Sequence, residues 1–109
     1  MGAGRGLAAW GHKGRFTYQG DLSRGTRVLH GHGSAFVVPA ALYAEMLAHF
    51  AGREVEIGAS RAPPRGSLNA WLRHRLPDVE VPVAYVGPIL VAEGAAVRVG
   101  PGTLAMGSP

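Results

Sequence analysis

Four arginines and no acidic residue lie in one short stretch of the chain, residues 61–76. A guanidinium group carries a permanent charge and a planar set of N–H donors, so it pairs well with phosphate oxygens. This stretch therefore predicts contacts to a polyanion such as the backbone of DNA or RNA, and a second basic stretch, residues 1–27, adds to it. The residues expected to contact phosphate are Arg61, Arg65, Arg73 and Arg75, assisted by Lys13 and Arg15. A solvated surface with no ligand would have the same composition.

The segment His30-Gly31-His32 has the spacing of two metal ligands on one strand. Residues two apart on a strand point to the same side, so both imidazoles can approach one ion. A zinc site needs further ligands, and nothing in the spacing selects among His12, His49, Asp21 and the glutamates. Glycine and histidine in this order are also common in a hairpin turn. His30 and His32 are thus candidates for a metal-binding protein, and no cofactor is predicted.

The acidic residues offer little for catalysis. Glu54 and Glu56 alternate with apolar residues on an expected strand, which points both carboxylates toward solvent. The chain has no cysteine, which excludes disulfides, thiolate chemistry and cysteine-based zinc sites. No catalytic residue is predicted, and we expect a protein that binds rather than one that catalyses.

The composition is that of one small folded domain. Apolar residues make up 47% of the 109 residues and charged residues 17%, enough for a single core. The 17 glycines and 8 prolines predict short elements joined by many turns. No apolar run approaches the roughly 20 residues that cross a bilayer, and no secretion signal is recognised, so we expect no membrane contact and a cytoplasmic location.

Hydrophobic periodicity in the first half predicts an α+β fold. Alternating residues indicate strands near 15–19, 26–30, 34–38 and 54–58, which form a small, mostly antiparallel sheet. Pro39 opens a helix that extends to Phe50 and packs on this sheet. A loose arm, or at most a weak helical turn, is expected over residues 1–13, a compact domain over 14–101, and a frayed tail over 102–109.

The second half is expected to be mainly helical. Ser67 is a good N-cap for a helix over 68–76, and Pro82 opens another over 83–93, which Gly87-Pro88 bends or splits. A strand over 95–99 and the turn Gly100-Pro101-Gly102 follow. This order resembles a winged helix-turn-helix, which implies that the helix after Pro82 lies in a nucleic-acid groove. Tyr85 is the one side chain of that helix expected to reach a base edge by hydrogen bonding.

The leading hypothesis is a small accessory protein that binds nucleic acid through arginine contacts to phosphate. The alternative is an adaptor or oligomeric component that binds a protein partner or itself. The apolar residues that motivate it, in excess of what one small core was expected to hide, are Trp10, Val83, Tyr85 and Ile89.

Overall fold

The first four strands of the chain form one antiparallel sheet in which consecutive strands are neighbours. The computed structural model describes residues 4–11 and 14–108. The strands are β1 (Arg5–Ala8), β2 (Arg15–Asp21), β3 (Gly25–His30) and β4 (Ser34–Val38), in the order β1-β2-β3-β4. Phe16 and Tyr18 on β2 and Val28 on β3 point into the core, as the alternating pattern predicts.

The rest of the chain builds three helices and a second antiparallel sheet. The helices are α1 (Ala40–His49), α2 (Leu68–Arg75) and α3 (Val83–Ala92). The strands are β5 (Glu54–Glu56), β6 (Ala96–Gly100) and β7 (Thr103–Met106), in the order β5-β7-β6. The predicted cap of α2 is confirmed, because the Ser67 hydroxyl accepts a hydrogen bond of 3.1 Å from the amide of Ala70.

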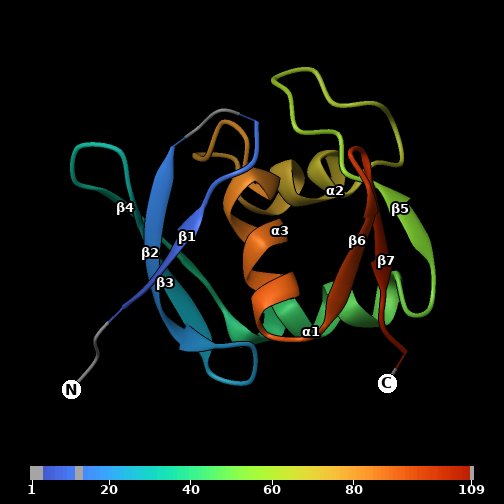
Figure 1. Ribbon diagram of the computed structural model, residues 1–109, viewed down its shortest axis with the longest axis horizontal. Coiled ribbons are helices and arrows are strands. Elements are labelled where there is room, and N and C mark those ends of the chain that lie inside the picture. Colours follow the sequence, from blue (N-terminus) through green and yellow to red (C-terminus); the bar gives the residue numbers. More distant parts are fainter. Residues whose placement is uncertain (1–3, 12–13, 109) are drawn as a thin grey trace.

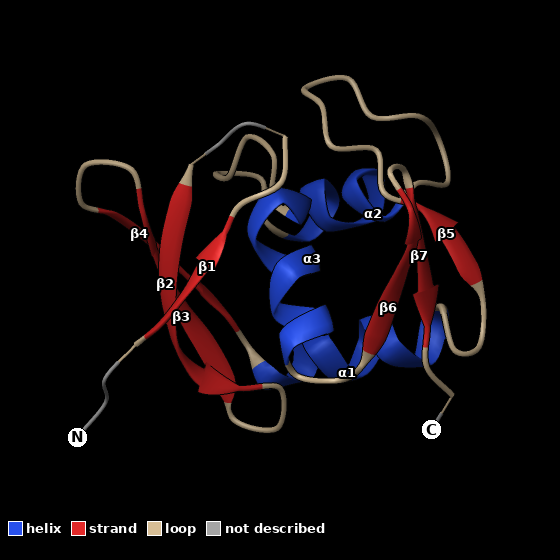
Figure 2. Ribbon diagram, in the orientation of Figure 1, coloured by secondary structure: helices blue, strands red, loops and turns tan. Residues whose placement is uncertain are grey.

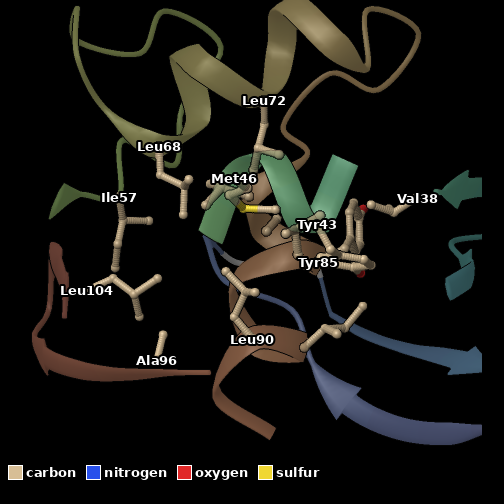
Figure 3. Packing of buried hydrophobic residues seen from close by; sticks show 14 of the residues in the cluster. Val38, Tyr43, Met46, Ile57, Leu68, Leu72, Tyr85, Leu90, Ala96 and Leu104 are labelled. Carbon is tan, nitrogen blue, oxygen red and sulfur yellow. The ribbon is translucent and has the colours of Figure 1, made fainter. Parts of the chain in front are cut away.

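Helix α3 lies at the centre of the molecule, between the two sheets (Figures 1 and 2). Every residue from Val83 to Leu90 is buried, which explains the almost uniformly apolar sequence of this helix. The face expected to enter a nucleic-acid groove is therefore internal. One hydrophobic cluster joins side chains from both sheets and all three helices, so the chain is a single α+β domain (Figure 3).

Three sequence-based expectations are corrected by strand pairing. Strand β5 does not extend the first sheet, because Val55 pairs with Leu104 in the second. The expected loose arm contains β1, which pairs with β2 through Leu7 and Phe16, so its described part is neither loose nor helical. The expected frayed tail contains β7, which is the central strand of the second sheet because its neighbours on both sides supply hydrogen-bond partners.

Helix α3 continues through Gly87-Pro88, where the sequence predicts a bend or a split. None of the helices in the described residues is long and apolar enough to span a lipid bilayer.

Candidate functional site

Two of the four arginines expected to contact phosphate, Arg61 and Arg73, already interact with groups in loops of the protein. Arg61 forms an ion pair with Glu80, in the connection between α2 and α3. Arg73 donates a hydrogen bond to the backbone carbonyl of Arg61. Part of the positive charge of residues 61–76 is thus neutralised by Glu80, a residue outside that stretch.

Arg75 forms a bridge between α2 and α1. Its Nε and Nη2 atoms lie 2.9 and 2.7 Å from the Oε1 atom of Glu45, and its Nη1 atom donates to the carbonyl of Trp71 at 3.2 Å. The guanidinium carbon also lies 3.8 Å from the centroid of the Trp71 indole. Arg75 therefore holds two helices together, and its charge is compensated by a carboxylate.

Arg65 lies in a different environment, a groove of about 450 Å³ between the end of α1 and the start of α2. Four side chains that carry or can accept a positive charge line this groove: His49, Arg53, Arg65 and His74. None of the described residues that line it has a carboxylate. We call these four residues and the space between them the cationic groove.

Aromatic packing holds one wall of the cationic groove in place. The His49 imidazole stacks on Trp71 with the ring centroids 6.0 Å apart, and it meets Phe50 edge-on at 4.6 Å. Arg53 donates to the carbonyl of His49 at 3.5 Å and lies 5.7 Å from the Phe50 ring centroid. The end of α1 and the residues just after it are therefore anchored, and both His49 and Arg53 line the groove.

Trp71 supports this wall rather than offering a free ring for a nucleic-acid base. Arg75 covers its indole at 3.8 Å, and the His49 ring lies beside it at an interplanar angle of 26°. The apolar stripe of α2, which also contains Leu68 and Leu72, favours the same packing role for Trp71. The groove therefore offers charge and hydrogen-bond donors, and little aromatic surface.

The other predicted site residues that the structure describes do not line the cationic groove. Arg15 is exposed on β2, in the first sheet, and lines a separate shallow pocket with Gly6 and Thr17. Lys13 lies outside the described residues. Of the six predicted phosphate contacts, the groove contains Arg65.

Sequence reasoning missed Arg53 and His74, and it considered His49 only as a possible further metal ligand. His49 and Arg53 are four positions apart in the sequence, at the end of α1 and just after it. They belong to a part of the chain whose net charge is negative. Summing charges over long stretches of sequence does not reveal these two residues. Their position beside a helix end, away from its apolar face, is the signal that was available in the sequence.

The two histidines considered as metal ligands lie in different surroundings. The His30 ring packs against Tyr85 with a centroid distance of 4.5 Å and against Phe36 at 5.6 Å, and burial lowers the pKa of His30. His32 is exposed in the turn between β3 and β4. Among residues 4–11 and 14–108, no group of three or more histidine, cysteine or acidic side chains is placed to hold an ion.

The residues that motivated a protein-binding adaptor are packed inside the molecule. Val83 and Ile89 are fully buried and Tyr85 is 7% exposed. Trp10 is partly buried and packs against the core, where its amide donates to the carbonyl of Ala84 at 3.0 Å. The apparent excess of apolar residues is thus accounted for by packing around α3, in which every residue from Val83 to Leu90 is buried.

Comparison of the chain with protein-family models, with curated proteins and with solved structures finds no match.

Proposed function

We propose that this protein is a small, non-catalytic nucleic-acid-binding protein that holds phosphate groups in the cationic groove. The observation that carries the proposal is the convergence of Arg53, Arg65, His49 and His74 on one concave space whose described lining has no carboxylate. The protein has a net charge of +4, and the cationic groove concentrates positive side chains with no acidic residue among its described lining residues.

Phosphodiester groups fit this chemistry. Arginine forms paired hydrogen bonds with phosphate oxygens, and the release of counterions from the nucleic acid drives binding. Such contacts fix the backbone and carry no sequence information. With Trp71 covered by Arg75 and His49, base stacking adds little, so we expect binding that depends on salt and hardly on sequence.

We further propose that residues 40–106 have a winged-helix arrangement. The order helix, strand, helix, helix, strand, strand and the strand order β5-β7-β6 support this resemblance. The first sheet covers α3, the helix that such domains commonly place in the major groove. The proposed contact is therefore made from the side of α1 and α2, to phosphates and not to base edges.

The test replaces the two groove arginines together, Arg53→Gln with Arg65→Gln. Binding of labelled single-stranded DNA, duplex DNA and RNA is measured by fluorescence anisotropy between 50 and 200 mM salt. We expect at least a tenfold loss of affinity at low salt. Two lost phosphate contacts should also reduce the slope of log K against log salt by about 1.4 for a single strand.

A matched pair, Arg24→Gln with Arg27→Gln, removes the same charge from the first sheet and its hairpin. This control should retain most of the affinity. The proposal is contradicted if the wild-type protein binds no nucleic acid at low salt, or if both pairs weaken binding equally.

A further inference from the structure

A second cavity, of about 460 Å³, lies where the first sheet meets the connection between α2 and α3. Its walls come from the end of β3, the start of β4, residues 78–81 and the first turn of α3. Figure 1 shows this connection beside one end of the four-stranded sheet. The volume falls within the range of cavities that hold small ligands.

One wall of the cavity is aromatic. The rings of His30, Phe36 and Tyr85 are in mutual contact, with centroid distances of 4.5, 5.6 and 5.8 Å. Phe16 supports Tyr85 from behind in an edge-on contact at 5.3 Å. These contacts present a rigid, slightly electronegative surface against which a flat or cationic group can lie.

The Tyr85 hydroxyl is the polar group that this wall leaves without a partner. The hydroxyls of Tyr18 and Tyr43 are hydrogen-bonded to Glu93 and Thr26, at 2.6 and 2.7 Å. The Tyr85 side chain is only 7% exposed, and no described residue hydrogen-bonds its hydroxyl. No polar side-chain atom of the described residues is both fully enclosed and unpartnered, so this hydroxyl is open to accessible space. Tyr85 is one of the residues that line the cavity.

The charged groups at the cavity are carboxylates. Asp78 and Glu80 line it, and neither lysine nor arginine is among its described lining residues. Arg61 holds Glu80 in an exposed ion pair, whereas Asp78 has no ion pair with any described residue. Burial lowers the pKa of His30, so its ring is mainly neutral near pH 7 and leaves the cavity with negative charge.

We propose that this cavity binds an organic cation that carries N–H donors on a flat or apolar body. The guanidinium group of an arginine side chain is the representative example of such a cation. Its N–H groups would donate to the Asp78 carboxylate and to the Tyr85 hydroxyl. Its planar face would lie against the ring of Phe36 or His30. This ligand is opposite in charge to the one proposed for the cationic groove. A negative result at one site therefore does not contradict the proposal for the other.

The experiment is an NMR titration of the ¹⁵N-labelled protein with arginine amide, with its neutral isostere citrulline amide, and with tetramethylammonium. We expect saturable shifts confined to residues 30–36 and 78–85 for arginine amide. Citrulline amide should bind at least tenfold more weakly because it lacks the charge. Tetramethylammonium should also bind more weakly because it has no N–H donor.

Three variants assign the interaction. Tyr85→Phe removes the hydroxyl and keeps the ring, and Asp78→Asn removes an exposed charge, so both should fold, and each should weaken arginine amide binding at least threefold. Glu56→Gln, an equal charge change on β5, should leave it unchanged. The proposal is overturned by the absence of saturable shifts, by equal binding of either comparison ligand, or by a Tyr85→Phe affinity equal to that of the wild type.

Discussion

The backbone amide of Trp10 donates a hydrogen bond of 3.0 Å to the carbonyl oxygen of Ala84, in the first half of α3. Within a helix, this carbonyl would accept from the residue four positions later, and that residue is Pro88, which has no N–H. The segment after β1 thus supplies the donor that the helix lacks. The same segment lays the Trp10 indole over Gly87, where a Cβ atom would overlap the ring.

Gly87→Ala is expected to destabilise the protein even though alanine favours helix. The added methyl group would displace Trp10 and its hydrogen bond to Ala84. This overpacking costs about 2 kcal/mol, more than the gain in helix propensity of about 1 kcal/mol. Urea unfolding followed by circular dichroism measures the difference. In a Trp10→Ala background the same substitution should cost nothing or stabilise, and an equal loss in both backgrounds would show that Trp10 is not the cause.

This relationship also explains why local sequence analysis predicted a break in α3. Gly87-Pro88 is a valid helix-breaking signal, and it is overridden by a partner far away in the sequence. Strands β1 and β7 were missed for a similar reason. Arg5–Ala8 is short and rich in small residues, and Thr103–Met106 follows a Gly-Pro-Gly turn, so only pairing with β2, β5 and β6 identifies them as strands.

Asn69 is expected to be among the most sensitive polar residues. It is fully buried, its amide nitrogen donates to the carbonyls of Gly58 and Ser60 at 2.9 Å each, and its oxygen accepts from the amide of Val83 at 3.2 Å. Asn69→Ala removes all three hydrogen bonds, at a cost of about 3 kcal/mol. The Gly58 carbonyl keeps the amide of Ser60 at 2.7 Å, whereas the Ser60 carbonyl and the Val83 amide lose the partner that Asn69 supplies. Ser60→Ala, which keeps the Ser60 carbonyl, should change the unfolding free energy by less than about 0.5 kcal/mol. Similar losses for the two variants would contradict this role.

Tyr18 and Glu93 are expected to be energetically coupled. Glu93 is the C-cap residue of α3, and its backbone amide donates to the carbonyl of Ile89 at 2.9 Å. Its carboxylate belongs to the C-terminal end of the helix, where the helix dipole disfavours negative charge. The Tyr18 hydroxyl at 2.6 Å and the Arg5 guanidinium at 3.0 Å compensate for this. Tyr18→Phe should cost about 2 kcal/mol, as for a hydrogen bond to a charged group. In a Glu93→Gln background the cost should fall, and strict additivity in the double-mutant cycle would rule out the coupling.

Stability should decline as the pH falls through the range in which His30 titrates. Burial lowers the pKa of His30 in the folded state below its ordinary value of about 6.5, so the unfolded chain binds this proton first. The stabilisation is present above the unfolded pKa and is lost as the pH falls from there through the lowered pKa. His30→Phe keeps ring contacts with Tyr85 and Phe36 and removes the titration. Urea midpoints at pH 7.5 and 5.0 should differ less for this variant, and an unchanged difference would assign the effect to other groups.

The candidate site could be anticipated from the sequence only in part. The arginine-rich stretch was a real signal, and it led to Arg65. Counting charges along the chain does not reveal that Glu45 and Glu80, distant in sequence, neutralise Arg75 and Arg61. Nor does it reveal that Arg53 approaches Arg65, because the fold places the end of α1 against the start of α2.

The single variants Arg65→Ala and Arg75→Ala are therefore expected to differ in which property they change, nucleic-acid affinity for Arg65→Ala and folding stability for Arg75→Ala. Arg75→Ala removes the bridge to Glu45 and uncovers Trp71, which should lower the unfolding free energy by about 1 kcal/mol, because the pair is partly exposed. Its affinity for single-stranded DNA should change less than twofold. Arg65→Ala should leave stability within about 0.5 kcal/mol and lower the affinity several-fold. Anisotropy titrations and urea unfolding on both variants measure the two quantities. Equal losses of affinity would extend the contact surface to the whole stretch 61–76, whereas unchanged affinity in Arg65→Ala would remove the groove from the binding site.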